Sequence, residues 1–310
     1  MLTKSGRKFG LGLKVAIVLL AAGYIVRRFF TTDDPVAIAS HIFSCLTFFP
    51  FTFLTVLLLM PLNWMLEAWK WKLAAGQQVQ ISFANAMRGV LAGVTTGTAT
   101  PNRIGEFAGR IFMEKEADRV PLLFLSFVCS FCQVTITFFA GITGMLLLEN
   151  NAGLTQNEML FIYVTGIIFC CVPLLLPVLP AKWKEKTKQL RQFPLPVFSK
   201  ILFLSAIRYS IYVFQFMLLV RMFRPELFCL EIAGSIMVSY LVVTMVPTFS
   251  FTEVFIRGSI AGLIFSAAGF GRIGFLAGVL LWLINVAIPS LVGTVYVFRL
   301  KFTRKEKECP

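Results

Sequence analysis

The stretch TTGTATPNRIGEFAGR, residues Thr95–Arg110, places two arginines, a glutamate, an asparagine and a proline inside an otherwise apolar chain. A charged side chain at the centre of a membrane helix costs about 3 kcal/mol on insertion scales. Such charges are usually kept for a substrate pathway or a buried ion pair. The stretch therefore indicates both the class of fold and the place where the function should be sought.

The composition around this stretch is that of an integral membrane protein. The chain has 310 residues, of which 57% are hydrophobic and 14% charged, and its mean hydropathy is +0.81. A soluble domain carries about 25% charged residues. We therefore expect an all-α polytopic membrane protein, with residues 1–310 forming a single transmembrane domain.

Hydropathy predicts about six full spans, because a spanning helix needs about 20 mostly apolar residues. The predicted spans are 11–30, 38–66, 120–148, 159–180, 199–222 and 273–299. Two other apolar regions, 82–113 and 229–269, are each interrupted by polar residues. They are predicted to be re-entrant helical hairpins, since broken backbone at membrane depth must be sheltered by protein or by a water-filled cavity.

The distribution of basic residues predicts the orientation. The net charge of +14 does not indicate nucleic acid, because no compact basic domain is present to bind a duplex. With a cytoplasmic N-terminus, 19 of the 29 lysines and arginines lie on the cytoplasmic side, five outside, and five within apolar segments. This bias predicts a multi-pass protein of the plasma (inner) membrane with both termini cytoplasmic. The same loops would face the same sides if each hairpin crossed the membrane fully. The count of basic residues is therefore compatible with both re-entrant and spanning hairpins.

The two halves of the chain share a motif. Pro101, Glu106 and Arg110 in the first half recur as Pro247, Glu253 and Arg257, at offsets of 146, 147 and 147 residues. Each half then holds two spans, a hairpin and a third span, and an odd number of crossings inverts the second half. We therefore predict a first repeat over residues 1–150 and a second, inverted repeat over 151–310, an architecture that recurs in transporters.

The motif residues suit a lipid headgroup. Glu106 and Arg110 are four residues apart and share a helical face. Arg103 and Arg110 can bind phosphate bidentately, as can the N-terminus of a helix that starts after Pro101. Glu106 and Glu253 can hold an amine or a proton. The expected substrate-binding residues are Pro101, Asn102, Arg103, Gly105, Glu106, Arg110, Glu253 and Arg257.

Several of these features also have a purely structural explanation. Glu253 and Arg257 can form a structural salt bridge, and the glycines of the first hairpin can serve close helix packing. A group at a predicted span end is expected to anchor the chain at the membrane interface: Asn63, Glu67, Lys70 and Lys72. Cys129 and Cys132 are spaced as CxxC within an apolar span, where a structural role is expected.

The segments NWMLEAWKWKLAA (63–75) and FANAMRGVLAGVTTGTATPNRIGEFAGRIF (83–112), followed by a late P-x-x-x-x-x-E hairpin, carry a family resemblance. They resemble the lysylphosphatidylglycerol synthase transmembrane region, also called the flippase-like domain family, over roughly residues 10–300. The first hairpin matches the family pattern P-x-x-x-G-E…R. The second departs from it, since PTFSFTE (247–253) has no glycine. The resemblance implies a stand-alone translocating module without the synthase domain.

The expected function is therefore a membrane lipid translocase that moves a phospholipid or glycolipid headgroup through a polar groove between the hairpins. One alternative is a membrane-embedded lipid- or glycolipid-modifying enzyme, with Glu106 as base, or the non-catalytic partner of one; another is an ion-coupled small-solute transporter. The sequence holds no HExxH, GxSxG or P-loop motif, so we expect no catalytic residue, metal or cofactor. Expected partners are the lipid and either a second copy of the chain or a lipid-synthesising enzyme.

Overall fold

The computed structural model describes residues 47–113, 119–148, 160, 164, 193–227, 230–246, 248 and 252–298. Some predicted features lie outside these residues, namely the span at 11–30, almost all of the span at 159–180, both termini and Pro247.

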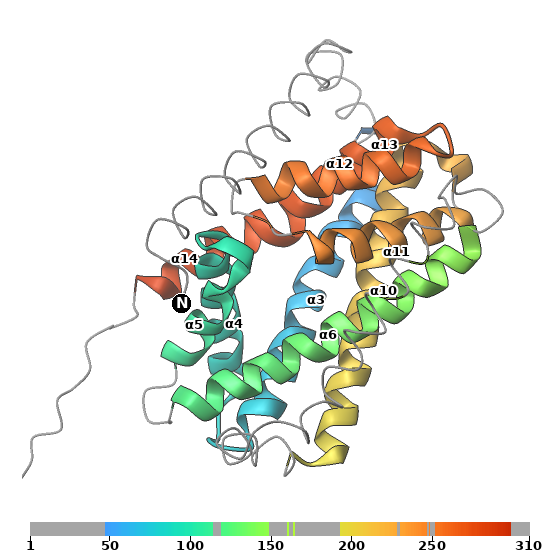
Figure 1. Cartoon of the computed structure of the whole chain (residues 1–310). Helices are drawn as coiled ribbons and strands as arrows, with labels where there is room; N and C mark the ends of the chain where they lie inside the picture. Colours follow the sequence, from blue (N-terminus) through green and yellow to red (C-terminus); the bar gives the residue numbers. More distant parts are fainter. Residues whose placement is uncertain are drawn as a thin grey trace, which may run out of the picture.

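Four long apolar helices form the frame of the molecule (Figure 1). They are α3 (Pro50–Ala75), α6 (Arg119–Leu148), α10 (Leu195–Phe223) and a continuous run built from α13 (Gly271–Trp282), the π-helical η5 (Leu283–Ala287) and α14 (Ile288–Val297). Each is long and apolar enough to cross a membrane. The part of the chain that the structure describes contains helices and no strand. The protein is thus a helical membrane protein, and these helices coincide with four of the six predicted spans.

Helix α3 differs from its prediction at both ends. The predicted span covers 38–66, whereas the helix starts at Pro50 and runs on to Ala75. Proline is favoured at the first helical position, because its missing N–H has no intrahelical acceptor there. The longer C-terminal end has a consequence for the site, since it places Glu67 and Lys70 inside the helix rather than at its end.

Two helical hairpins complete the fold. The first hairpin, residues 83–112, consists of α4 (Phe83–Thr98), the 3-10 turn η1 (Pro101–Arg103) and α5 (Gly105–Phe112). The second hairpin, residues 230–266, consists of α11 (Leu230–Met245) and α12 (Glu253–Ser266). At 1.5 Å per residue, α4 and α11 are each about 24 Å long, shorter than the roughly 30 Å hydrocarbon core of a bilayer.

Two pairs of helices, one member in each half, are related by an offset of 147 residues. Adding 147 to the bounds of α4 gives those of α11, and adding it to α3 gives the bounds of α10 to within two residues. In each half, the first helix of the hairpin packs on the last long helix of the other half. Helix α11 packs on α6 of the first half, where Gly144 faces Gly234, and α4 packs on α14 of the second half, where Gly293 faces Leu91.

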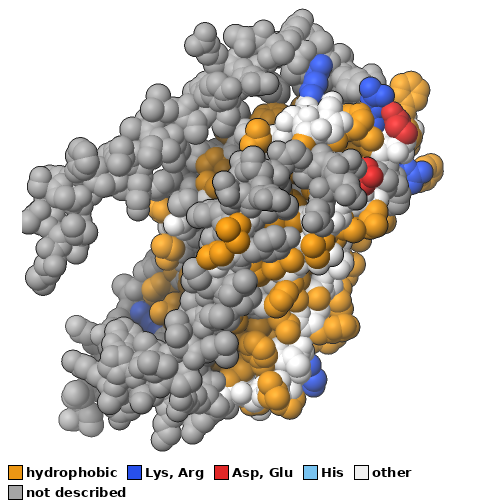
Figure 2. All heavy atoms as spheres, turned by 45° about the vertical axis from the view of Figure 1, so that its right-hand side comes forward, with side chains coloured by type: hydrophobic (Ala, Val, Ile, Leu, Met, Phe, Trp, Pro, Cys, Tyr) orange, Lys and Arg blue, Asp and Glu red, His pale blue; other side chains and the backbone are white. Residues whose placement is uncertain are grey.

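The outer surface is strongly apolar. Figure 2 shows hydrophobic side chains spread over the described part of one face, with charged side chains toward its upper and lower ends. Large apolar side chains are exposed on all four long helices, among them Leu58, Phe127, Phe203 and Leu291. In a soluble protein such a surface would aggregate, whereas here it is the surface that faces lipid.

Candidate functional site

Glycines bring the two helices of the first hairpin into backbone contact. A Cβ on Gly109 would collide with the backbone of Gly93, and a Cβ on Gly105 would collide with the carbonyl of Thr96. Small residues at such crossings allow helices to approach closely. Gly105 was predicted to bind substrate, and in the structure it is a buried packing residue.

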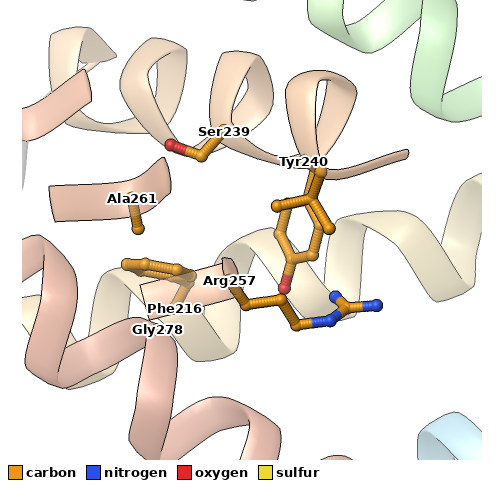
Figure 3. A pocket seen from close by; sticks show the side chains of 7 residues that line it. Phe216, Ser239, Tyr240, Arg257, Ala261 and Gly278 are labelled. Carbon is orange, nitrogen blue, oxygen red and sulfur yellow. The ribbon is translucent and has the colours of Figure 1, made fainter. Parts of the chain in front are cut away.

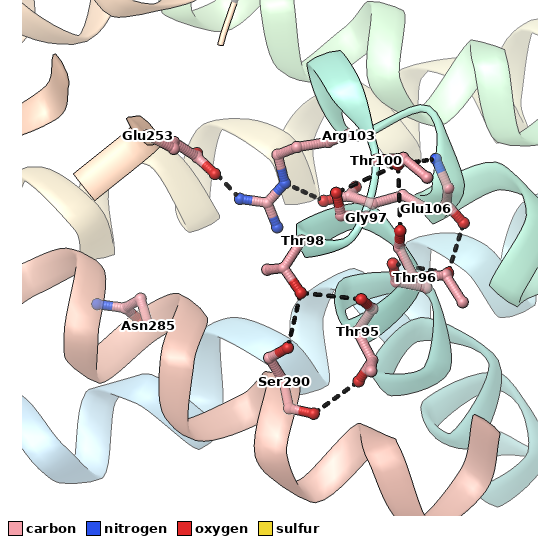
Figure 4. Close-up of polar contacts among 12 residues, drawn as sticks. Thr95, Thr96, Gly97, Thr98, Thr100, Arg103, Glu106, Glu253, Asn285 and Ser290 are labelled. Atoms are coloured by element: carbon pink, nitrogen blue, oxygen red, sulfur yellow. Dashed lines mark hydrogen bonds and ion pairs between the residues drawn. The ribbon is translucent and has the colours of Figure 1, made fainter. Parts of the chain in front are cut away.

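Threonines satisfy the broken backbone of this hairpin. Thr96 Oγ1 donates to the carbonyl of Gly105 at 2.6 Å, and the Gly105 N–H donates to Thr100 Oγ1 at 2.7 Å. Thr95 Oγ1 donates to the carbonyl of Ser290 at 2.7 Å, which ties the hairpin to α14 (Figure 4). The N-terminus of α5 is therefore not the free anion cradle that the sequence suggested, because its Gly105 N–H already has an acceptor. The side chains have to supply the anion-binding groups.

The tips of the two hairpins touch. The N–H of Asn102 donates to the carbonyl of Thr248 at 2.8 Å, and the N–H of Thr248 donates to Asn102 Oδ1 at 3.0 Å. Asn102 and Arg103 both have left-handed backbone, with φ of 50° and 56°. Asparagine tolerates this region better than most residues, whereas arginine seldom adopts it. The tip thus holds an unusual turn, and it is bonded to the residue 146 positions later.

Four charged side chains bridge the tips, and we call them the tip cluster: Arg103, Glu106, Glu253 and Arg257. Arg103 lies between two carboxylates, with Nε 2.5 Å from Glu106 Oε1 and Nη1 3.4 Å from Glu253 Oε1 (Figure 4). Arg257 pairs with Glu253 at 2.8 Å. Two cations face two carboxylates, so the tip cluster is balanced in charge.

A second cluster lies deeper in the protein, between α3, α5, α6 and α10. Its centre is Glu67, which pairs with Lys70 at 3.0 Å, with Arg110 at 2.9 Å and with Arg208 at 3.0 Å. Arg110 Nη2 is also 3.7 Å from Glu106 Oε2, which joins this cluster to the tips. The result is one continuous network of ion pairs that runs from α3 and α10 through the first hairpin to the second.

Two neutral amides, Asn63 and Gln133, complete a group that we call the Glu67 cluster. Its members are Asn63, Glu67, Lys70, Arg110, Gln133 and Arg208. Asn63 Oδ1 accepts a hydrogen bond from Arg208 Nε at 2.7 Å. Gln133 Oε1 accepts from Lys70 Nζ at 3.3 Å and from Arg208 Nη1 at 3.4 Å. The guanidinium of Arg208 also lies over the Trp64 ring at 5.1 Å, a favourable cation–π contact.

The structure contradicts the interpretation of Asn63, Glu67 and Lys70 as interfacial anchors. Their exposed fractions are 0%, 3% and 0%, and all three join the Glu67 cluster. Residues 63, 67 and 70 follow the spacing of one helical face, which was the available signal for a buried polar stripe. Lys72 points the other way and is exposed.

The remaining predicted site residues divide into two groups. Arg103, Glu106, Arg110, Glu253 and Arg257 come together in the network. Pro101 and Asn102 are exposed at the tip.

A small cavity opens beside the second hairpin. It is lined by Phe216, Ser239, Tyr240, Val243, Arg257, Ala261 and Gly278 (Figure 3). Its volume of about 20 Å³ has room for about one water molecule. The Arg257 side chain borders it, and the cavity is far too small for a lipid headgroup.

The cysteines of the CxxC pair are buried free thiols on α6. Cys129 Sγ donates to the carbonyl of Lys70 at 3.8 Å, which places it behind the Glu67 cluster. Within the described residues, no three histidine, cysteine, aspartate or glutamate side chains gather as a metal site would require.

Comparison with known proteins finds no matching protein-family model, no matching curated protein and no matching solved structure.

Proposed function

We propose that the protein is a lipid translocase that moves a phospholipid or glycolipid headgroup between its two hairpins. The observation that carries the proposal is the continuous ion-pair network that joins Glu67, Arg110, Glu106, Arg103 and Glu253 across both hairpins. Charges at membrane depth are costly, and a substrate pathway is a common reason to keep them.

In this proposal six spans and two re-entrant hairpins form an inverted repeat. The offset of 147 that relates α3 to α10 and α4 to α11 supports the repeat, as does the crossed packing of α4 on α14 and of α11 on α6. The lengths of α4 and α11 support hairpins that enter the membrane and turn back. With both termini in the cytoplasm of a plasma (inner) membrane, the first hairpin enters from the cytoplasmic side and the second from the outer side.

The alternating charges of the network provide a path for a headgroup. A phosphate can replace Glu253 or Glu106 as the partner of Arg103, because guanidinium groups bind phosphate and carboxylate with similar geometry. An amine on the same headgroup can pair with the carboxylate that is released. The acyl chains stay in the surrounding lipid throughout, so only the polar part of the molecule enters the protein.

The tips are closed in this structure. The two hydrogen bonds between Asn102 and Thr248 and the ion pair between Arg103 and Glu253 must all break before a headgroup can pass. Because a phosphate can compensate Arg103 as the pair opens, the substrate itself lowers the free energy of the open state. This is ligand-dependent population shift, which requires that the headgroup bind the open state more tightly than the closed one.

The ion-coupled alternative gains no support from the site. Glu106 lies beside Arg103 and Arg110, and Glu253 lies beside Arg103 and Arg257. Both carboxylates are therefore already paired with guanidinium groups, which a coupling ion would have to displace.

The test is the transbilayer movement of headgroup-labelled lipids in proteoliposomes. Glu106→Gln should abolish most of the movement, because Arg103 and Arg110 then lose a charged partner on the path. Glu226→Gln is the matched control, since Glu226 pairs with Arg224 at 2.9 Å on the exposed surface, away from the network. Equal rates for both variants would contradict the proposal. Absence of movement for every anionic, aminoacylated and glycosylated lipid, together with product formation or co-purification of a transferase, would favour the enzyme-or-partner alternative.

A further inference from the structure

The last long helix, Gly271–Val297, packs on a different hairpin in each of its two parts (Figure 1). In the α13 part, a Cβ on Gly274 would lie 2.7 Å from the carbonyl oxygen of Ala261 on α12. In the α14 part, Ser290 is hydrogen-bonded to Thr95 and Thr98 of α4, at 2.7 and 2.9 Å (Figure 4). Helix α12 is therefore held on α13, and α4 is held on α14.

The groups that close the tips belong to these two units. Arg103 lies in the turn that follows α4, and Glu253 is the first residue of α12. Their side chains form the ion pair that joins the hairpins. A change of angle between α13 and α14 would therefore change the separation of Arg103 and Glu253.

The helix is interrupted between these two parts. In η5 the Ile288 N–H donates to the carbonyl of Leu283, five residues back, instead of the usual four. Pro289 follows and has no N–H to donate to the carbonyl of Asn285. Sharp bends in long helices are almost always found at a proline or a π-bulge, and residues 283–289 contain both. We call residues 283–289 the hinge.

Trp64 on α3 supplies the hydrogen bond that Pro289 cannot. Its Nε1 donates to the carbonyl of Asn285 at 3.1 Å, and both residues are buried. A buried carbonyl without a donor would carry the full cost of its desolvation. The same indole ring lies under the guanidinium of Arg208 at 5.1 Å, and Arg208 pairs with Glu67. Trp64 thus contacts both the hinge and the ion-pair network.

We propose that the hairpin tips separate by bending at the hinge, and that Trp64 is the positioning residue that holds the hinge in its closed shape. The inference rests on the proposed function and deepens it, since the tips must part before a headgroup can pass. In the open state α14 moves with the first hairpin away from α13 and α12, and the Asn285 carbonyl leaves Trp64. Bending at an existing interruption breaks fewer helical hydrogen bonds than bending a regular helix.

Tip opening is measured by hydrogen exchange of the full-length protein in a non-ionic detergent. The amides of Asn102 and Thr248 report on it, because in the closed state each is hydrogen-bonded to the other residue. Such amides exchange when the local structure opens, so their exchange rate follows the open population when closing is fast. Fragmentation of the labelled peptides in the mass spectrometer resolves the two positions.

Trp64→Phe removes the indole donor while keeping an aromatic ring for Arg208. The closed state then loses one buried hydrogen bond, so both reporter amides should exchange about fivefold faster. Trp69→Phe is the matched control, because Trp69 is exposed on the same helix. It should leave the exchange rates unchanged.

Pro289→Ala should act in the opposite direction. Alanine supplies an N–H for the Asn285 carbonyl, so the helix gains a backbone hydrogen bond across the hinge and both amides should exchange about fivefold more slowly. Pro61→Ala is its control, since Pro61 lies exposed within α3. A general loss of stability would speed exchange in every variant, whereas the hinge predicts opposite changes for Trp64→Phe and Pro289→Ala.

The outcomes separate the two proposals. Unchanged exchange in Trp64→Phe and Pro289→Ala, or a change in the same direction in both, would overturn the hinge. Opposite changes would support it, and lipid movement in proteoliposomes should then be faster in Trp64→Phe and slower in Pro289→Ala. If exchange changes as expected but the wild type moves no lipid, the proposed function fails while the hinge stands.

Discussion

The tip cluster and the Glu67 cluster both pair arginines with glutamate, but they differ in charge balance and in the burial of Arg103 and Glu106 against Arg110 and Glu67. At the tips two arginines face two glutamates, and Arg103 and Glu106 keep 21% and 22% of their side-chain surface exposed. Around Glu67 three cations share one carboxylate, and the Arg110 and Glu67 side chains are each 4% exposed. A balanced, partly exposed network can exchange partners with a headgroup, whereas the buried cations around Glu67 all depend on one shared carboxylate.

The largest expected effect is that of Glu67→Gln. This change leaves Lys70, Arg110 and Arg208 buried without their shared anion, and breaking a buried pair costs about 3–5 kcal/mol. The loss should appear as a large fall in melting temperature in detergent. In Glu226→Gln the melting temperature should not change measurably. A fall no greater than in that control would mean that the Glu67 cluster does not stabilise the fold.

A smaller effect is expected from Gly109→Ala, where the new methyl group collides with the backbone of Gly93. Overpacking of this kind costs about 1–3 kcal/mol. Gly89→Ala, on the α4 side of the same hairpin contact, should be neutral or stabilising, because it makes only ordinary contacts and removes a helix glycine. Thermal unfolding of the two variants side by side measures the difference. The packing account is wrong if Gly89→Ala is the more destabilising of the two.

The smallest effect on stability is expected at the tip itself. Asn102→Ala removes the acceptor for the Thr248 N–H and puts alanine at a φ of 50°, which costs about 1–2 kcal/mol. Asn102→Gly loses the same hydrogen bond without the backbone strain and should cost less. Because both changes weaken the closed state, both should speed lipid movement in proteoliposomes. Slower movement in Asn102→Gly would contradict the role of this contact in closure.

Much of the frame could be predicted from hydropathy, because helices that face lipid must be long and apolar along their whole length. The positions of α6, α10 and the run Gly271–Val297 agree with predicted spans. The division of the apolar region 82–113 into α4 and α5 was also predictable, since Thr-, Gly- and Pro-rich sequence separates two short apolar segments.

The partners of the charged residues were harder to predict. The spacing of Glu106 and Arg110 indicates a local pair, and the two do meet at 3.7 Å. The closest carboxylate to Arg110 is nevertheless Glu67 on α3, at 2.9 Å. Such a contact depends on how the helices pack, which no local pattern records. Glu67 itself was misplaced because the predicted span ended at residue 66, whereas the helix continues to Ala75.

In the proposed mechanism a lipid headgroup passes between the hairpin tips. This passage is tested by locking the tips with a disulfide, in the double variant Asn102→Cys, Thr248→Cys, at two residues whose backbones are already joined by a hydrogen bond. Transbilayer movement of headgroup-labelled phosphatidylglycerol is measured in the same proteoliposomes before and after reduction, with Asn102→Cys alone as the control for the native cysteines. The account predicts that the oxidised double variant moves no lipid and that reduction restores movement to the rate of the single variant. Equal rates in the oxidised and reduced protein, with the crosslink verified, would contradict it.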